Sequence, residues 1–287
     1  MITNHSFALA RPEFFRRVVF DECEHLHDQA MSAWSHRVSF PDMRRILRRL
    51  HEPGARSGTG RQRPALDRLK KRVLPGSAAH ERLRAALTLW THASTALSDL
   101  EAQVLAYEGW RSAALLGRGE SEQHGLFREF VETCPDAAEM ITARVALESS
   151  LARLDSALAQ LSEELELAPL RRGERIRRTL ELSRVDVAET GRAVASWLPM
   201  NDGLPSLGNR VFHDVERNVR DEPVLAALVL LPGDALGRHY YPELSSAAFV
   251  SATTRLGGSF DKARSDLGLD RVAARDPETG DLDYTAG

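Results

Sequence analysis

Hydrophobic residues along the first 200 positions recur at intervals of three and four, the spacing that places side chains on one face of an α-helix. Prolines, glycines and serines interrupt the pattern and mark the ends of the expected helices. The pattern predicts helices over 12–38, 41–50, 65–74, 77–116, 120–133, 136–167 and 172–198. Ser77 is the expected N-cap of the helix over 77–116. We therefore expect a mainly α protein built as a multi-helix bundle.

The segment 136–167 carries a row of leucines spaced alternately four and three residues apart, which is the a/d pattern of a coiled coil. The row consists of Leu147, Leu151, Leu154, Leu158, Leu161 and Leu165. Such a seam needs an apolar partner, which is either another helix of the chain or a second copy. The next segment, 172–198, has its own apolar stripe, so we expect a long antiparallel helical hairpin over 136–198.

The pattern changes after Leu198, where Pro, Gly and Asn become frequent. A helix is expected over 209–220, whereas the apolar run 223–231 fits either a buried helical turn or a buried strand. The segment 240–269 has the pattern of a small helical module. The expected organisation is a bundle over 1–198, which contains a basic helix-loop-helix over 41–74. A linker or loop over 199–208, a small C-terminal helical region over 209–269 and a loose tail over 270–287 follow.

Composition adds few constraints to this picture. The chain has 287 residues and only two cysteines, Cys23 and Cys134, which excludes a disulfide scaffold and a four-cysteine zinc site. No apolar run approaches the roughly 20 residues of a membrane span, and the N-terminus lacks the pattern of a secretory signal. We expect a cytoplasmic protein with no membrane association. Glycine-rich phosphate-binding motifs and the GxSxG motif are absent, and no cofactor is expected.

Charge is distributed unevenly. The net charge is −3, but the segment 41–73 holds eleven Lys and Arg against three acids, so it carries +8 and the remainder carries −11. The basic residues are Arg44, Arg45, Arg48, Arg49, Arg56, Arg61, Arg63, Arg68, Lys70, Lys71 and Arg72. An arginine-rich, glycine-containing loop between two basic helices suits phosphate contact, because arginine forks match phosphate oxygens. An acidic protein partner and a plain solvated face are the alternatives.

Two further features bear on nucleic acid. Arg171 and Arg172 open a second basic cluster at a helix start, where positive charge opposes the helix dipole and an external anion would be favoured. The segment 243–269 resembles the small helix-turn-helix-like repeat associated with homing endonucleases. The matching residues are Arg255, Leu256, Gly258, Ser259, Phe260, Ala263, Gly268 and Leu269. The resemblance implies phosphate contacts from Arg255, Lys262 and Arg264, but Gly257 is an extra residue and a tryptophan-like position is missing.

One arrangement would support a metal site. Glu24 and His27 are three residues apart, and Glu120 and His124 are four apart, so each pair shares a helix face. Glu-x-x-His spacing occurs in carboxylate-bridged metal centres of helical bundles. A helical metal-dependent oxidase or oxygenase is therefore one hypothesis for the function, and it ranks third.

The leading hypothesis is a non-enzymatic nucleic-acid-binding subunit of a larger assembly. The second hypothesis is a protein–protein scaffold whose basic block docks an acidic partner.

Overall fold

The computed structural model describes residues 4–10, 14–54, 63–116, 126–167, 174–201, 204–205, 211–251, 259–272, 274–275 and 282–283. The chain is mainly α, as the sequence predicts. It divides into two compact units. Unit 1 comprises 1–35, 208–212 and 228–287, and unit 2 comprises 36–207 and 213–227. No helix of the described part is long and apolar enough to cross a membrane.

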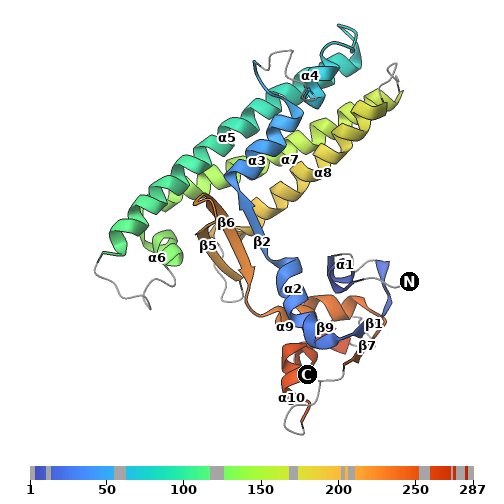
Figure 1. Cartoon of the computed structure of the whole chain (residues 1–287), viewed down its shortest axis with the longest axis vertical. Coiled ribbons are helices and arrows are strands. Elements are labelled where there is room, and N and C mark those ends of the chain that lie inside the picture. The colour runs from blue at the N-terminus through green and yellow to red at the C-terminus, as the bar shows by residue number, and fades with distance from the viewer. Residues whose placement is uncertain are drawn as a thin grey trace. The chain divides into compact units, whose positions relative to one another are not determined.

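Three long helices form the framework of unit 2 (Figure 1). They are α5 (Ala78–Ala114), α7 (Ala137–Leu167) and α8 (Glu174–Ser196), and α7 packs against both of the others. The leucine row of α7 is buried along its whole length. Helices α7 and α8 are antiparallel, because Arg144 near the start of α7 contacts Val194 near the end of α8. The predicted hairpin is confirmed, and α5 also packs against α7.

The helix N-caps follow local sequence rules. Ser77 accepts a hydrogen bond from the His80 N–H at the start of α5, and Ser39 accepts one from Asp42 N–H at the start of α3 (Phe40–Leu50). Both hydroxyls satisfy an amide that has no partner within its helix. Two short helices, α4 (Ala65–Leu69) and α6 (Leu126–Thr133), are the other helices among the described residues of this unit. The helix expected over 65–74 thus ends five residues early, and 70–72 form a turn.

A small sheet lies at one end of the bundle (Figure 1). Its strand order is β2 (His36–Ser39), β6 (Pro223–Val229) and β5 (Val211–Arg217), and β2 and β6 are antiparallel. The apolar run 223–231 is therefore a strand. The helix expected over 209–220 is wrong, because β5 is extended and alternates buried His213 and Val215 with less buried neighbours. Short strands β3 (Met200–Asn201) and β4 (Leu204–Pro205) pair within the expected linker.

The helix expected over 12–38 is wrong. The described residues of that segment form β1 (Arg17–Asp21), the 3-10 helix η2 (Cys23–His25) and α2 (Leu26–Trp34) of unit 1, and then enter β2 of unit 2. Strand β1 pairs in parallel with β7 (Ser246–Val250), which replaces part of the helical module expected over 240–269. The remaining elements are α1 (His5–Ala10), α9 (Pro232–Ala235), the π-helix η4 (Leu236–Tyr240), the 3-10 helix η5 (Tyr241–Glu243), α10 (Asp261–Asp266), the 3-10 helix η6 (Leu269–Arg271), β8 (Ala274–Arg275) and β9 (Leu282–Asp283).

One apolar cluster joins the two ends of the chain in unit 1. Phe20, Cys23 and Leu26 pack with Leu236 and Leu267. The units therefore differ from the linear division into 1–198 and 209–269, since residues 1–35 share a core with the C-terminal segment. Strands β8 and β9 pair within the expected loose tail.

Candidate nucleic-acid interface

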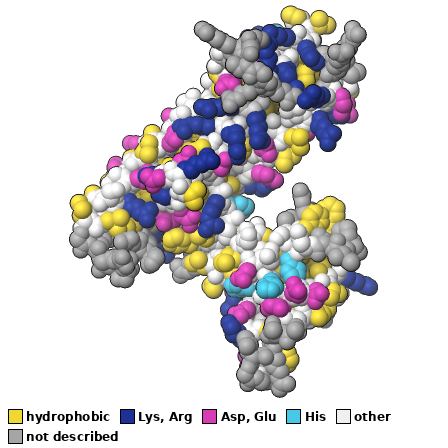
Figure 2. Space-filling view, viewed as in Figure 1, with side chains coloured by type: hydrophobic (Ala, Val, Ile, Leu, Met, Phe, Trp, Pro, Cys, Tyr) yellow, Lys and Arg dark blue, Asp and Glu magenta, His cyan; other side chains and the backbone are white. Residues whose placement is uncertain are grey.

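Helix α3 separates apolar from basic side chains. Met43, Leu47 and Leu50 are buried on one face, and the apolar face packs into the bundle core. The arginines predicted to contact phosphate lie on the remaining surface of this helix, namely Arg44, Arg45, Arg48 and Arg49. Figure 2 shows Lys and Arg side chains spread over this part of the molecule, with Asp and Glu side chains among them.

Acidic residues of the same unit bind three of these four arginines. Arg44 forms an ion pair with Glu101 of α5, and Arg49 pairs with Asp186 of α8 at 2.9 Å. Arg45 pairs with Asp42 one turn earlier, at 2.6 Å. Arg48 is exposed and makes no ion pair with a residue that the structure describes. This face therefore carries less free positive charge than the sequence indicates.

A basic pocket lies beyond the end of α3. It has a volume of about 410 Å³, and its lining residues come from the end of α3 and from the segment that includes α4. They are His51, Glu52, Gly54, Arg63, Pro64, Asp67, Lys70 and Lys71. Three of these, Arg63, Lys70 and Lys71, are predicted phosphate contacts, and the fold brings them together at one concave surface. These three cations outnumber the two carboxylates of the lining, Glu52 and Asp67, so the concave surface carries a net positive charge that favours an anion.

Hydrogen bonds fix one wall of the basic pocket. His51 Nδ1 lies 2.6 Å from Asp67 Oδ1, and the Glu52 N–H donates to Asp67 Oδ2 at 3.2 Å. The His51 ring also packs edge-on against Trp90, whose Nε1–H donates to the Leu47 carbonyl. Asp67 is thus largely engaged by the protein itself, although Lys70 Nζ also approaches it at 3.7 Å. Arg63 and Lys71 form no described ion pair, although the Glu52 side chain also belongs to the lining of the pocket.

The predicted contacts Arg68 and Arg72 do not line this pocket. They lie four residues apart, with the α8 residue Arg175 close enough to act on the charge of Arg68. Burial, followed by the charges of Arg175 and Arg72, lowers the pKa of the Arg68 guanidinium. The basic block is therefore divided into the α3 face, the basic pocket and this arginine group.

Several predicted site residues lie outside the described residues, so the structure does not place them. They are Arg56, Arg61, Arg171, Arg172, Arg255, Glu120 and His124. Lys262 is in α10 of unit 1 and pairs with Asp266 at 3.0 Å, one helical turn away. Part of the segment that resembles the homing-endonuclease repeat is also undescribed, and that resemblance remains a prediction.

The metal hypothesis gains no support from the described residues. Glu24 lies in the 3-10 helix η2, whereas His27 lies in α2 with its Nδ1 3.1 Å from the Asp266 carbonyl oxygen. The part of the chain that the structure describes holds no group of three or more His, Cys, Asp or Glu that could bind a metal ion.

The structure also reveals a buried polar cluster that the sequence does not mark. His213 in β5 is buried, and its Nδ1 accepts a hydrogen bond from the Leu198 N–H at 3.3 Å. The Tyr107 hydroxyl lies 3.4 Å from Asp214 Oδ1, and burial raises the pKa of the Asp214 carboxyl. Had 209–220 been assigned as a strand, the two-residue alternation would have placed His213 and Val215 on the inner face.

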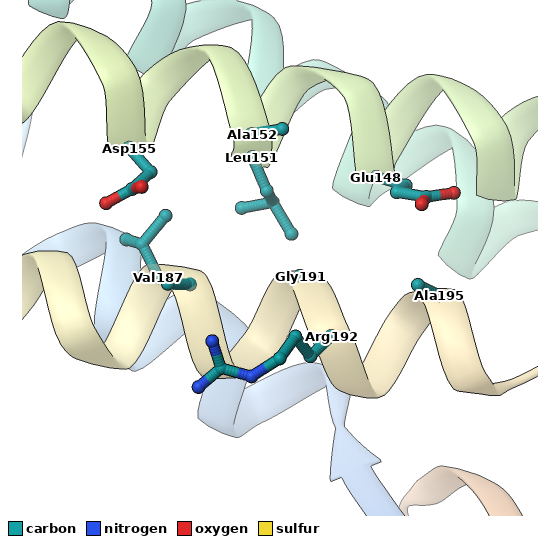
Figure 3. Close-up of a pocket in the computed structure, with 9 residues that line it drawn as sticks. Glu148, Leu151, Ala152, Asp155, Val187, Gly191, Arg192 and Ala195 are labelled. Atoms are coloured by element: carbon teal, nitrogen blue, oxygen red, sulfur yellow. The ribbon is translucent and has the colours of Figure 1, made fainter. Parts of the chain in front are cut away.

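A shallow groove of about 250 Å³ runs between α7 and α8 (Figure 3). Small residues create it, because Gly191 faces Leu151 where a larger side chain would fill the space. Its carboxylates are already engaged: Glu148 binds Arg144, and Asp155 binds Arg184. The groove therefore offers an apolar floor without unpaired acids for chemistry.

The candidate interface thus belongs to a mainly α protein with a basic pocket at one end of a long helical bundle. Comparison with protein-family models and with curated proteins finds no match to this chain.

Proposed function

We propose that this protein is a non-enzymatic nucleic-acid-binding subunit of a larger assembly that contacts the phosphate backbone through its basic block. The observation that carries the proposal is the convergence of Arg63, Lys70 and Lys71 on one pocket. Arginine and lysine are the side chains that most often contact backbone phosphates, and such contacts do not depend on base sequence. Exposed Arg48 extends the basic surface along α3.

The test is fluorescence anisotropy of short single- and double-stranded DNA and RNA across a salt series. Binding should weaken steeply as salt rises, because each neutralised phosphate releases counterions. The pocket variant changes Arg63, Lys70 and Lys71 to Ala. For a duplex, it should flatten the slope of log K against log salt by up to about 3, since each lost phosphate contact contributes about 0.9.

A matched variant controls for the loss of charge alone. It changes Arg84, Arg153 and Arg220 to Ala, which are exposed arginines of the same unit away from the basic pocket. This control should bind like the unmodified protein. If both variants lose the same affinity for nucleic acid, binding depends only on the overall charge and not on the pocket. If the unmodified protein does not bind nucleic acid even at low salt, the proposal is rejected.

A protein–protein scaffold is the second candidate. The α3 arginines favour it, because Arg44, Arg45 and Arg49 already bind carboxylates of this chain. A surface that accommodates these carboxylates also suits an acidic protein partner. Oligomerisation of the chain, or binding to a protein partner without binding to nucleic acid, would favour this candidate.

A further inference from the structure

Arg68 is an unusual member of the basic block. It extends from α4, the short helix that packs against both α8 and α5. Its Nε and Nη2 atoms are buried and have no hydrogen-bond acceptor among the residues that the structure describes. A guanidinium carries five N–H donors, and buried donors without acceptors lose hydration without compensation. Since buried polar groups are usually satisfied, Arg68 needs an acceptor that the described residues do not supply.

The residues around Arg68 raise the energy of its charged guanidinium. The charges that act on its guanidinium most strongly are those of two other arginines, Arg175 and Arg72. The acid next to Arg175 in sequence, Glu174, is bound to Arg177 at 3.2 Å. Like charges close to a partly buried cation raise the energy of its charged form.

We propose that Arg68, with Arg72 and Arg175 beside it, forms a binding site for a phosphate group. A phosphate supplies several acceptor oxygens for the buried Arg68 donors and a negative charge that stabilises the Arg68 guanidinium. The planar fork of arginine donates two parallel hydrogen bonds to such an oxyanion. This inference rests on the proposed function for the source of the phosphate, which is the nucleic-acid backbone. A free phosphate ion has the same chemistry, so the experiment separates the two sources.

The first measurement is the thermal stability of the full chain in inorganic phosphate, with sodium chloride adjusted to keep ionic strength constant. A ligand that binds only the folded state raises the melting temperature with its concentration. At a phosphate concentration ten times the dissociation constant, the rise should be roughly 3 °C for a chain of this size. Arg68→Met keeps the apolar stem and should abolish the rise, whereas the exposed α5 variant Arg84→Met should preserve it.

Arg175→Gln is the second variant, because Arg175 is exposed and its replacement does not disturb the core. It should reduce the phosphate effect without removing it. In the absence of phosphate, Arg68→Met should be at least as stable as the unmodified protein, since it removes a buried charge without an acceptor. A phosphate effect that is the same in Arg68→Met and in Arg84→Met would overturn the site.

The second measurement is anisotropy of a labelled oligonucleotide with the same variants. If the backbone supplies the phosphate, Arg68→Met should weaken binding about tenfold, a typical effect of losing a charge-assisted contact. Loss of the inorganic phosphate effect with unchanged oligonucleotide binding would overturn the backbone source and assign the site to free phosphate. If Arg68→Met changes neither the phosphate stabilisation nor oligonucleotide binding, and binding still depends on Arg63, Lys70 and Lys71, the Arg68 site is rejected. The proposed function then still stands.

Discussion

At the scale of single residues, burial determines which ionisable groups affect stability. His213 is 6% exposed, and burial lowers its pKa to about 4 from the ordinary value of 6.5. Its Nδ1 accepts from Leu198, so the proton of the neutral ring lies on Nε2, which has no partner among the described residues. The folded chain therefore favours the neutral imidazole.

This arrangement predicts a loss of stability in acid. Between pH 6.5 and pH 4 the unfolded chain binds a proton at His213 that the folded chain does not, so stability is complete above pH 6.5 and falls as the pH drops. The loss should reach about 2–3 kcal/mol at pH 4.5. His213→Asn keeps an acceptor for the Leu198 N–H but does not titrate. Urea unfolding at pH 7.5, 6.0 and 4.5 should show a flatter pH profile for the variant.

The neighbouring carboxyl has the opposite effect. The raised pKa of Asp214 makes its contribution to stability larger in acid. Asp214 is present in both proteins, so the difference between their profiles still reports His213. Parallel profiles would show that His213 does not control the acid sensitivity.

At the scale of elements, Arg144 links two helices. It is 2% exposed, and its Nε donates to the carbonyls of Val194 and Trp197 at 3.2 Å. Its remaining nitrogens bind the Ala195 carbonyl and Glu148. The last carbonyls of a helix have no partner within that helix, so a side chain of α7 caps the C-terminus of α8. The contact between α7 and α8 is thereby held by hydrogen bonds as well as by leucines.

Arg144→Met should therefore destabilise the bundle by about 3 kcal/mol, because buried carbonyls lose charged donors. Arg144→Lys keeps the charge but lacks the fork, and its effect should be intermediate. Arg153→Met, at an exposed position of the same helix, should change stability by less than about 0.5 kcal/mol. Chemical unfolding followed by far-UV circular dichroism measures all three, and an equal effect of Arg144→Met and Arg153→Met would contradict the capping role.

At the scale of the whole molecule, residues 36–227 separate the two parts of the chain that build the core of unit 1. Gly268 is essential for that core, since it has a φ of +69° and its backbone approaches Gly233 so closely that a Cβ would collide with the Gly233 carbonyl. The adjacent Leu267 packs in the cluster that also buries Cys23, which is 0% exposed. A substitution at Gly268 should therefore change the exposure of Cys23, although the two residues lie far apart in the sequence.

Gly268→Ala, made in a Cys134→Ser background, should make the Cys23 thiol react with an aromatic disulfide reagent at least tenfold faster. The reason is that the clash opens the apolar cluster that buries the thiol. The helical signal of the bundle should persist. The control is Gly76→Ala, which has a φ of +80° but open space around its Cβ, so it adds backbone strain without a clash. Unchanged Cys23 reactivity in Gly268→Ala would contradict the shared core.

The sequence by itself determined the features that depend on neighbouring residues. The leucine row of α7, the amphipathic α3, the Ser77 cap and the mainly α class all follow from helical hydrogen bonds that close within four residues. The grouping of Arg63, Lys70 and Lys71 was likewise visible as a charge excess, because these residues are near one another in the chain. The nucleic-acid role remains a proposal at both levels.

Only the tertiary structure decided features that depend on distant pairing. Strand β1 needs β7 as its partner, and His213 is buried only because β5 joins a sheet. The hydrogen bonds of a strand come from other segments of the chain, and the local spacing of hydrophobic residues does not reveal those segments. From the sequence, every arginine of the basic block is predicted to have the same role, which is contact with phosphate. The structure separates them, because Arg44 and Arg49 meet carboxylates from other helices whereas Arg68 meets arginines. The energy of a charge depends on its neighbours in space, and those are fixed only when the chain folds.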